Sequence, residues 1–102
     1  MNVVVIGLGS MGKRRVRLLR DLYNDVQICG VDAQVTRRAE CEEKFGVKTY
    51  DNLDSCLTNF LGEAAFICTP PLSHADIIRD CLLHGMHIFP KSISWQINMT
   101  KT

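Results

Sequence analysis

Three glycines near the start of the chain have the spacing of a phosphate-binding turn. Gly7, Gly9 and Gly12 form the pattern Gly-x-Gly-x-x-Gly, directly after an apolar, mostly β-branched run that ends at Ile6. In such a turn the first glycine permits a tight turn, the second lets the backbone approach a pyrophosphate, and the third allows close packing of helix on strand. The first N–H groups of the helix then face the phosphates, at the positive end of the helix dipole. We therefore favour a dinucleotide-binding turn over a merely tight connection.

A carboxylate is placed to bind a ribose. A second apolar stretch, Val26 to Val31, is followed by Asp32, twenty positions after Gly12. A carboxylate at this position can accept hydrogen bonds from the ribose hydroxyls of an adenosine. The alternative is that Asp32 only caps a helix or lies in a loop, without a ligand. Its charge repels a 2′-phosphate, which favours NAD, but NADP stays open because Arg37 and Arg38 follow closely. We expect these arginines to face solvent in the next helix.

The composition is that of a single soluble domain. The chain has 102 residues, 46% of them apolar, and a formal net charge of +1. We therefore expect no nucleic-acid partner and no membrane partner. The densest basic run is interpreted as the solvent-facing side of the first helix; it consists of Lys13, Arg14, Arg15, Arg17 and Arg20.

The cysteines indicate reduced, buried thiols rather than disulfides or a metal site. There are five, with no Cys-x-x-Cys pair, at positions 29, 41, 56, 68 and 81. Several lie within apolar patterns, where cysteine behaves as a small hydrophobic residue. The first apolar strand starts directly after Asn2, which leaves no room for a signal peptide, and the apolar runs are too short to span a membrane. With the reduced cysteines, these features lead us to expect a cytoplasmic protein without a signal peptide.

Strand and helix patterns alternate along the chain. Four helices are expected. The first starts at Lys13 and the second covers residues 34–45. The third follows a cap at Asp51 and has Leu61 on its apolar face, and the fourth follows a capping box at Ser73. The expected strands end near residues 6, 31, 50, 68 and 89. Alternation of this kind predicts an α/β fold, a Rossmann-type doubly wound parallel sheet of about five strands in the order 3-2-1-4-5. In this topology Thr69 and Pro70 follow the fourth strand near the nicotinamide half of a dinucleotide.

The motifs together resemble the N-terminal domain of the Gfo/Idh/MocA oxidoreductases, from residue 2 to about residue 94. They read Gly-Leu-Gly-Ser-Met-Gly-Lys-Arg, then Cys-Thr-Pro-Pro-Leu-Ser-His-Ala-Asp-Ile, then Gly-Met-His-Ile-Phe before a lysine. The resemblance implies NAD(P)-dependent hydride transfer on a sugar, cyclitol or related CH–OH compound. The motif and the resemblance together predict cofactor contacts at Gly7, Leu8, Gly9, Ser10, Met11, Gly12, Asp32, Thr69, Pro70 and His74.

The sequence departs from the family pattern after the fifth strand. Members continue with Glu-Lys-Pro, whose lysine lies near the reacting hydroxyl, whereas this chain continues from Phe89 with Pro90-Lys91-Ser92. Lys91 takes the place of that lysine if one residue is missing before Pro90, and the place of the glutamate otherwise. Lys91 is thus the one candidate catalytic residue, and an ordinary exposed lysine is the alternative.

The family resemblance also implies a second α/β domain that forms the substrate pocket. We expect a dinucleotide-binding domain over residues 1–94 and a short tail over 95–102, too short for that second domain. The chain alone is then expected to be inactive, and to associate with a second domain or to form a homo-oligomer through exposed apolar surface around Phe89, Ile93 and Trp95. The alternative is a stand-alone NAD-binding or redox-sensing module without catalysis.

Overall fold

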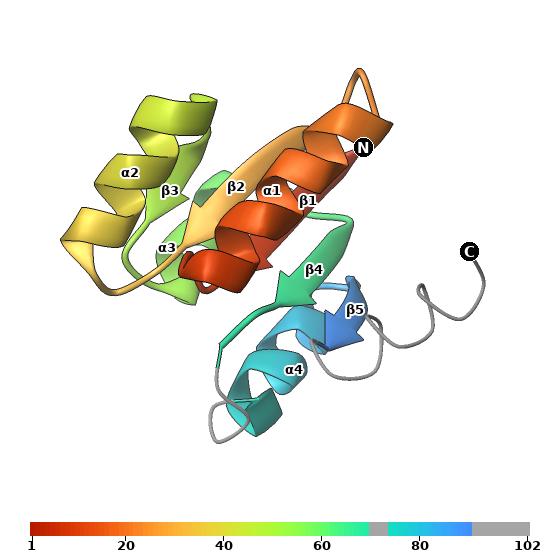
Figure 1. Ribbon diagram of the computed structural model, residues 1–102. Helices are drawn as coiled ribbons and strands as arrows, with labels where there is room; N and C mark the ends of the chain where they lie inside the picture. Colours follow the sequence, from red (N-terminus) through yellow and green to blue (C-terminus); the bar gives the residue numbers. More distant parts are fainter. Residues whose placement is uncertain (70–73, 91–102) are drawn as a thin grey trace.

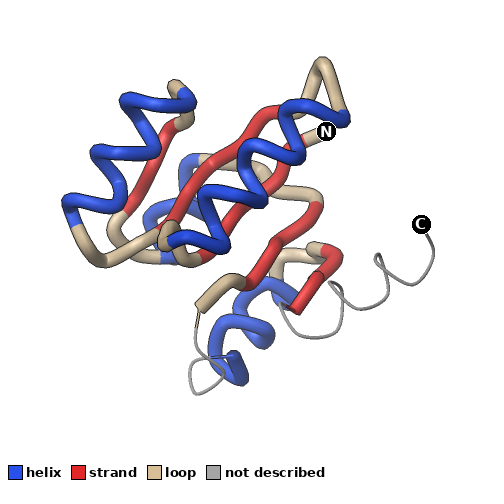
Figure 2. Tube along the Cα trace, in the orientation of Figure 1, coloured by secondary structure: helices blue, strands red, loops and turns tan. Residues whose placement is uncertain are grey.

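The computed structural model describes residues 1–69 and 74–90 as five strands and four helices in strict alternation (Figures 1 and 2). The elements are β1 (Asn2–Ile6), α1 (Ser10–Leu22), β2 (Gln27–Val31), α2 (Val35–Phe45), β3 (Lys48–Tyr50), α3 (Leu53–Asn59), β4 (Ala64–Ile67), α4 (His74–Leu83) and β5 (His87–Pro90).

The strands form one parallel sheet in the order β3-β2-β1-β4-β5. β1 lies at its centre, where Val3 to Val5 are fully buried, because helices cover both faces of a strand in this position. The predicted fold and strand order are confirmed. The order reverses between β1 and β4, and the carboxyl ends of these strands therefore flank the switch point at which α/β sheets of this type bind ligands.

Two apolar layers sandwich the sheet. α1 and α2 cover one face through Val16, Leu19 and Cys41, and α3 and α4 cover the other through Cys56 and Cys81 (Figure 1). Alternate residues of each strand face opposite layers, so neighbouring valines of β1 belong to different cores. Within the described residues, no helix has the length and apolar character that crossing a membrane requires.

The first helix begins three residues earlier than the sequence indicated, at Ser10 instead of Lys13. The first helical bond runs from the Lys13 N–H to the Gly9 carbonyl at 2.9 Å. Gly12 therefore lies in the first turn of the helix. The helix starts at the exposed, uncharged Ser10, and the basic pattern from Lys13 therefore does not mark its start.

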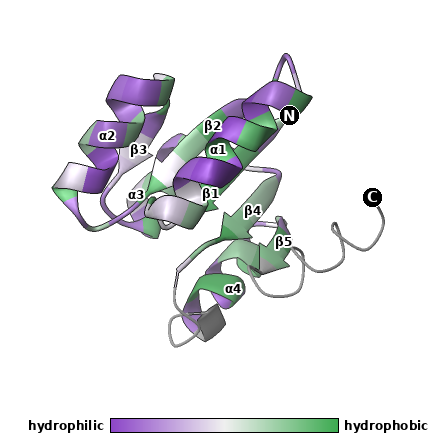
Figure 3. Ribbon diagram, in the orientation of Figure 1, coloured by the Kyte–Doolittle hydropathy of each residue, from purple (hydrophilic) through white to green (hydrophobic). Residues whose placement is uncertain are grey.

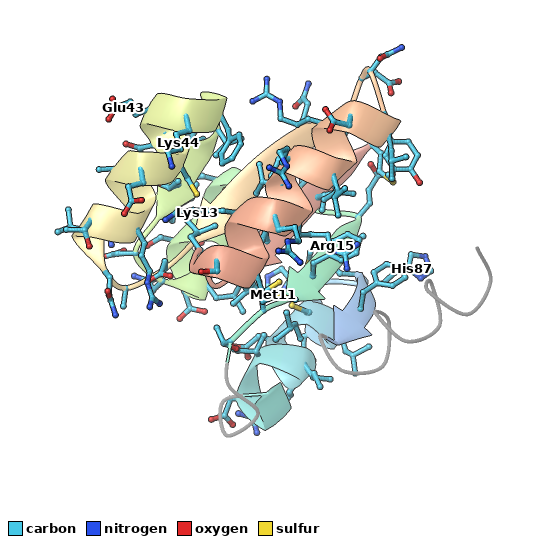
Figure 4. All side chains as sticks on the ribbon, viewed as in Figure 1. Met11, Lys13, Arg15, Glu43, Lys44 and His87 are labelled. Atoms are coloured by element: carbon cyan, nitrogen blue, oxygen red, sulfur yellow. The ribbon has the colours of Figure 1, made fainter. Side chains whose placement is uncertain are left out.

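Arg15 does not face solvent as expected. It is only 7% exposed, and its guanidinium lies 4.9 Å from the centroid of the Phe66 ring on β4, which in turn stacks on Phe89 of β5 at 4.8 Å. Burial lowers the pKa of Arg15 from its ordinary value. Figure 4 shows Arg15 on the flank of α1 toward β4, and Figure 3 shows β4 and β5 as apolar strands on that side. The arginine shares the inner face of α1 with Gly12, Val16 and Leu19, at helical spacing.

The cap of α3 is Asn52, not the predicted Asp51. The Asn52 side-chain oxygen accepts a hydrogen bond from the Ser55 N–H at 2.8 Å. The helix then ends at Asn59, so Leu61, predicted on its apolar face, lies beyond it and is 85% exposed. The error at the cap arises because two adjacent residues with similar capping preference leave the start of the helix open by one position.

We expect Asn52→Ala to lower the free energy of unfolding by about 1 kcal/mol, because one N–H of the first turn loses its acceptor. The matched control is Asp51→Ala, which removes only an exposed contact with the Asn52 amide. Thermal unfolding of the two variants measures the difference. Equal losses in both variants would contradict the assignment of the cap.

Candidate functional site

A cleft of about 440 Å³ opens at the carboxyl ends of β1 and β2, beside the segment that follows β4. It lies at the switch point of the sheet. Six of the predicted cofactor residues line this cleft: Gly7, Gly9, Ser10, Met11, Asp32 and Thr69. The other lining residues are Ile6, Val31, Ala33, Arg37 and Cys68.

Two glycines shape the turn for steric reasons. Gly7 has φ +93°, and a Cβ on it would lie 2.9 Å from Cγ2 of Thr69 and 3.0 Å from the backbone of Cys68. A Cβ on Gly12 would overlap the carbonyl oxygen of Gly7. The start of α1 thus packs directly on the turn, which is the role expected of a third glycine in this motif.

Leu8 and Gly12 do not line the cleft. The Leu8 side chain is fully buried against Gly30 of β2, where a Cβ would lie 2.9 Å from Leu8 Cδ1. The N–H of Leu8 already donates to the carboxylate of Asp32. Both residues therefore anchor the turn, and they hold neighbouring backbone in position for a ligand.

The start of α1 presents unused hydrogen-bond donors to the cleft. Gly9 is the N-cap and supplies no side-chain bond. Among the described residues, none accepts a hydrogen bond from the N–H groups of Ser10, Met11 or Gly12. Because Ser10 and Met11 border the cleft, this helix end can bind an anion such as a pyrophosphate.

Asp32 connects the turn to β2. Its Oδ2 accepts from the Leu8 N–H and its Oδ1 accepts from the Gln34 N–H, both at 2.8 Å. The side chain is only 7% exposed. Each carboxylate oxygen can accept more than one hydrogen bond, so ribose hydroxyls can still bind here. The carboxylate therefore fixes the glycine turn and also offers acceptors to a ligand.

Arg37 is exposed in α2, as expected, and Arg38 is half-buried, but the guanidinium groups of both also reach the end of β2. The Arg37 guanidinium lies 3.6 Å from Asp32 Oδ2 and borders the cleft beside Gly9. Arg38 Nη1 donates to the carbonyl oxygens of Asp32 and Ala33, at 2.8 and 3.1 Å. Both residues lie in the first turns of α2, and helical side chains lean toward the N-terminus of their helix. Because two arginines follow Asp32 at the start of the expected helix, this lean of helical side chains is the sequence signal that could have placed them beside Asp32.

The remaining predicted residues divide into three groups. Thr69 lies in the cleft against the turn. His74 begins α4, as predicted, but the structure describes only its backbone. Pro70 and Lys91 lie outside the described residues, as does Ser73 of the predicted capping box, and the role of Lys91 stays a prediction.

The match to a family model covers most of the chain. Residues 1–90 match the model of the oxidoreductase family GFO_IDH_MocA, described as having an NAD-binding Rossmann fold. The chain belongs to this Gfo/Idh/MocA family. The family description is that of an NAD-binding Rossmann fold, and sheets of this topology bind dinucleotides at the switch point, where the cleft lies.

One relative is similar to this chain in sequence, and two solved structures are similar to it in fold. Human biliverdin reductase A is 34% identical over 95 residues, which cover 90% of this chain and 31% of that protein. The WlbA dehydrogenase of Chromobacterium violaceum, solved with NADH and UDP-GlcNAcA, has a TM-score of 0.83 at 15% identity, with 92% and 28% of the two chains covered. The 3-ketoreductase KijD10 of Actinomadura kijaniata, solved with NADP, has a TM-score of 0.77 at 20% identity, with 92% and 29% covered.

The two structural likenesses establish the fold only, because both identities are low. This Gfo/Idh/MocA chain spans about a third of the length of the proteins it matches. The part in common is the NAD-binding Rossmann domain of the family.

Proposed function

We propose that the chain is the NAD(P)-binding domain of an oxidoreductase that acts by hydride transfer on a sugar, cyclitol or related CH–OH compound. The observation that carries this proposal is the set of free N–H groups at the start of α1, which open into the same cleft as Asp32. Donors for a pyrophosphate and acceptors for a ribose are thereby combined in one cleft.

The residues present fit a nicotinamide dinucleotide. Gly9 carries no side chain that would obstruct the approach of a phosphate, and the N–H groups of Ser10 and Met11 border the cleft. Asp32 holds the turn in shape through the Leu8 N–H, and Thr69 closes the cleft beside β4. When bound, the dinucleotide supplies or accepts a hydride, while this domain binds and orients it. Lys91 remains the proposed proton-handling residue.

The substrate depends on residues beyond this domain. The family resemblance favours a hydroxyl compound, and the 34% identity with human biliverdin reductase A favours biliverdin as a second candidate substrate. Both reactions would use the same cofactor cleft. We expect the domain alone to bind dinucleotide without turnover, and to require a second domain or a partner for catalysis.

A stand-alone NAD-binding module without catalysis is the second candidate function. The unused N–H donors at the start of α1 and the proposed ribose acceptor Asp32 all belong to one folded domain. This domain can therefore bind the dinucleotide without a second domain, which favours such a module. A change of oligomeric state on NADH binding would support this module, and unchanged mass in light scattering would favour the enzyme domain.

Arg37 bears on the choice of coenzyme. The carboxylate of Asp32 disfavours a 2′-phosphate, and the proposal is therefore a preference for NAD. The guanidinium of Arg37, 3.6 Å from that carboxylate and 44% exposed along its side chain, offsets part of the repulsion. We infer that NADP binds as well, but more weakly.

The test is calorimetric titration of the full chain with NADH and NADPH, in parallel with Arg37→Gln. We expect saturable binding of NADH by the wild type. In the variant, NADPH affinity should fall about tenfold and NADH affinity by less than about threefold, because only NADPH has a phosphate that pairs with the guanidinium. Arg17→Gln, on the exposed side of α1, removes the same charge and should change neither. No binding of either coenzyme by the wild type would refute the proposed function.

A further inference from the structure

Two cysteines from different elements meet in the core beneath β1, β2 and β4. Cys29 lies on β2 and Cys56 on α3, and both side chains are fully buried. Their Sγ atoms are 3.3 Å apart and share a hydrogen bond. Neither residue borders the dinucleotide cleft, and nothing in the proposed function uses them.

Local structure holds the two sulfur atoms together. Cys29 faces the α3 and α4 side of the sheet, in register with Lys48 of β3 and Val4 of β1. Cys56 lies in the first turn of α3, where its N–H donates to the carbonyl of the N-cap Asn52 at 3.3 Å. The strand and the capped helix turn thus fix both ends of the contact.

We propose that Cys29 and Cys56 form an oxidative modification site, at which a hydroperoxide converts the two thiols into a disulfide between β2 and α3. The sulfur atoms are separated by 3.3 Å, and a disulfide requires about 2.05 Å. The approach of a little over 1 Å is within the range of side-chain rotation combined with a small shift of α3.

The chemistry assigns different roles to the two thiols. Either thiol can donate in the hydrogen bond between the two sulfur atoms. With the proton on Cys29, this bond lowers the pKa of Cys56 and, together with burial, raises the pKa of Cys29. Because Cys56 lies on the short helix α3, whose opening exposes it, we assign Cys56 as the attacking thiolate. Its sulfur attacks the O–O bond of the hydroperoxide and becomes a sulfenic acid, with release of hydroxide or alkoxide. The sulfur of Cys29 then displaces the hydroxyl from that sulfenic sulfur, which forms the S–S bond and releases water once the protons are balanced.

The other buried cysteines are poor competitors. Burial raises the pKa of Cys81 to about 11, and burial also raises the pKa of Cys41. Cys41 belongs to the opposite core, beneath α1 and α2. Cys68 is half-buried at the dinucleotide cleft and is the thiol that solvent reaches first, so an experiment must remove it.

Access of the oxidant requires a local opening. α3 has only seven residues, and a helix of that length depends on its packing for stability. Its transient release would expose Cys56 while the sheet stays intact. The disulfide, once formed, closes a loop between residues 27 positions apart and should raise the melting temperature by about 10 °C or more.

The test uses the full chain with Cys68→Ser as background, treated with hydrogen peroxide. We expect the loss of two hydrogens in the intact mass, reversal by a thiol reductant, and a cross-linked peptide pair that contains Cys29 and Cys56. Cys56→Ala and Cys29→Ala should each abolish the cross-link, and Cys41→Ala and Cys81→Ala should retain it.

A sulfenic acid on Cys56 in the Cys29→Ala variant, trapped by a dimedone-type reagent, would support the order of the two steps. Cys29→Ser provides a second variant should Cys29→Ala fold poorly, since serine keeps a polar group beside Cys56. The proposal is overturned if the treated background protein retains all its thiols, if its cross-link joins Cys81, or if the cross-link persists without Cys29.

Discussion

Gly12→Ala should strongly destabilise this domain. A Cβ at this position would overlap the carbonyl oxygen of Gly7, a backbone atom that cannot move without distorting the turn. Overpacking against flexible side chains costs about 1–3 kcal/mol, and a clash with backbone is expected to exceed that range. We expect a loss of at least about 3 kcal/mol, which corresponds to a drop of about 12 °C or more in melting temperature for a domain of this size.

Gly46→Ala is the matched control for that variant. Gly46 has φ +65° at the end of α2, and a Cβ there would meet nothing within 4 Å. The substitution therefore measures only the strain of a left-handed backbone, about 1 kcal/mol. Thermal unfolding followed by circular dichroism compares the two. Similar melting temperatures for both variants would show that α1 can move away from the turn, and that Gly12 is not needed for close packing.

The features predicted correctly from the sequence are those that local pattern determines. The valines of β1 form a continuous apolar run because helices cover both faces of the strand, and the run leads directly into the glycine turn. Alternating strands and helices permit few strand orders in a parallel sheet, and the predicted order is the one observed.

The features that the sequence did not reveal depend on the three-dimensional positions of the ends of long side chains and on the packing of one element against another. Arg15 has the spacing of a buried position, but its charge favoured an exposed one, and only the position of Phe66 shows how the guanidinium is accommodated. The turn of Arg37 toward Asp32 depends on the angle at which α2 leaves β2. Likewise, Cys29 and Cys56 lie on elements whose relative position no local pattern specifies.

Asp32 has a structural role in the turn and is also the residue proposed to bind the ribose. It was expected either to bind a ribose or to act as a structural loop carboxylate. The structure shows the structural role, because both carboxylate oxygens accept backbone N–H bonds from Leu8 and Gln34, and it also places the carboxylate in the cleft. A residue in both roles should affect stability and coenzyme selection together, and the two effects can be measured separately.

We expect Asp32→Ala to weaken NADH binding at least tenfold. The variant loses the acceptors proposed for the ribose hydroxyls, and the buried N–H of Leu8 loses its partner, which costs about 1–3 kcal/mol of folding free energy. NADPH affinity should fall less than NADH affinity, because the charge that repels a 2′-phosphate disappears while Arg37 remains. Titration of both coenzymes well below the melting temperature of the variant, with circular dichroism as the check on folding, measures each effect.

The ratio of NADH affinity to NADPH affinity distinguishes a direct contact of Asp32 with the ligand from its structural support of the glycine turn. A distorted glycine turn would weaken NADH and NADPH by the same factor, since both carry the same pyrophosphate. Direct recognition of the ribose changes the ratio in favour of NADPH, because only the 2′ position differs between the coenzymes. An unchanged ratio together with a lower melting temperature would limit Asp32 to its bonds with Leu8 and Gln34, and the preference for NAD would then have to come from another residue of the cleft.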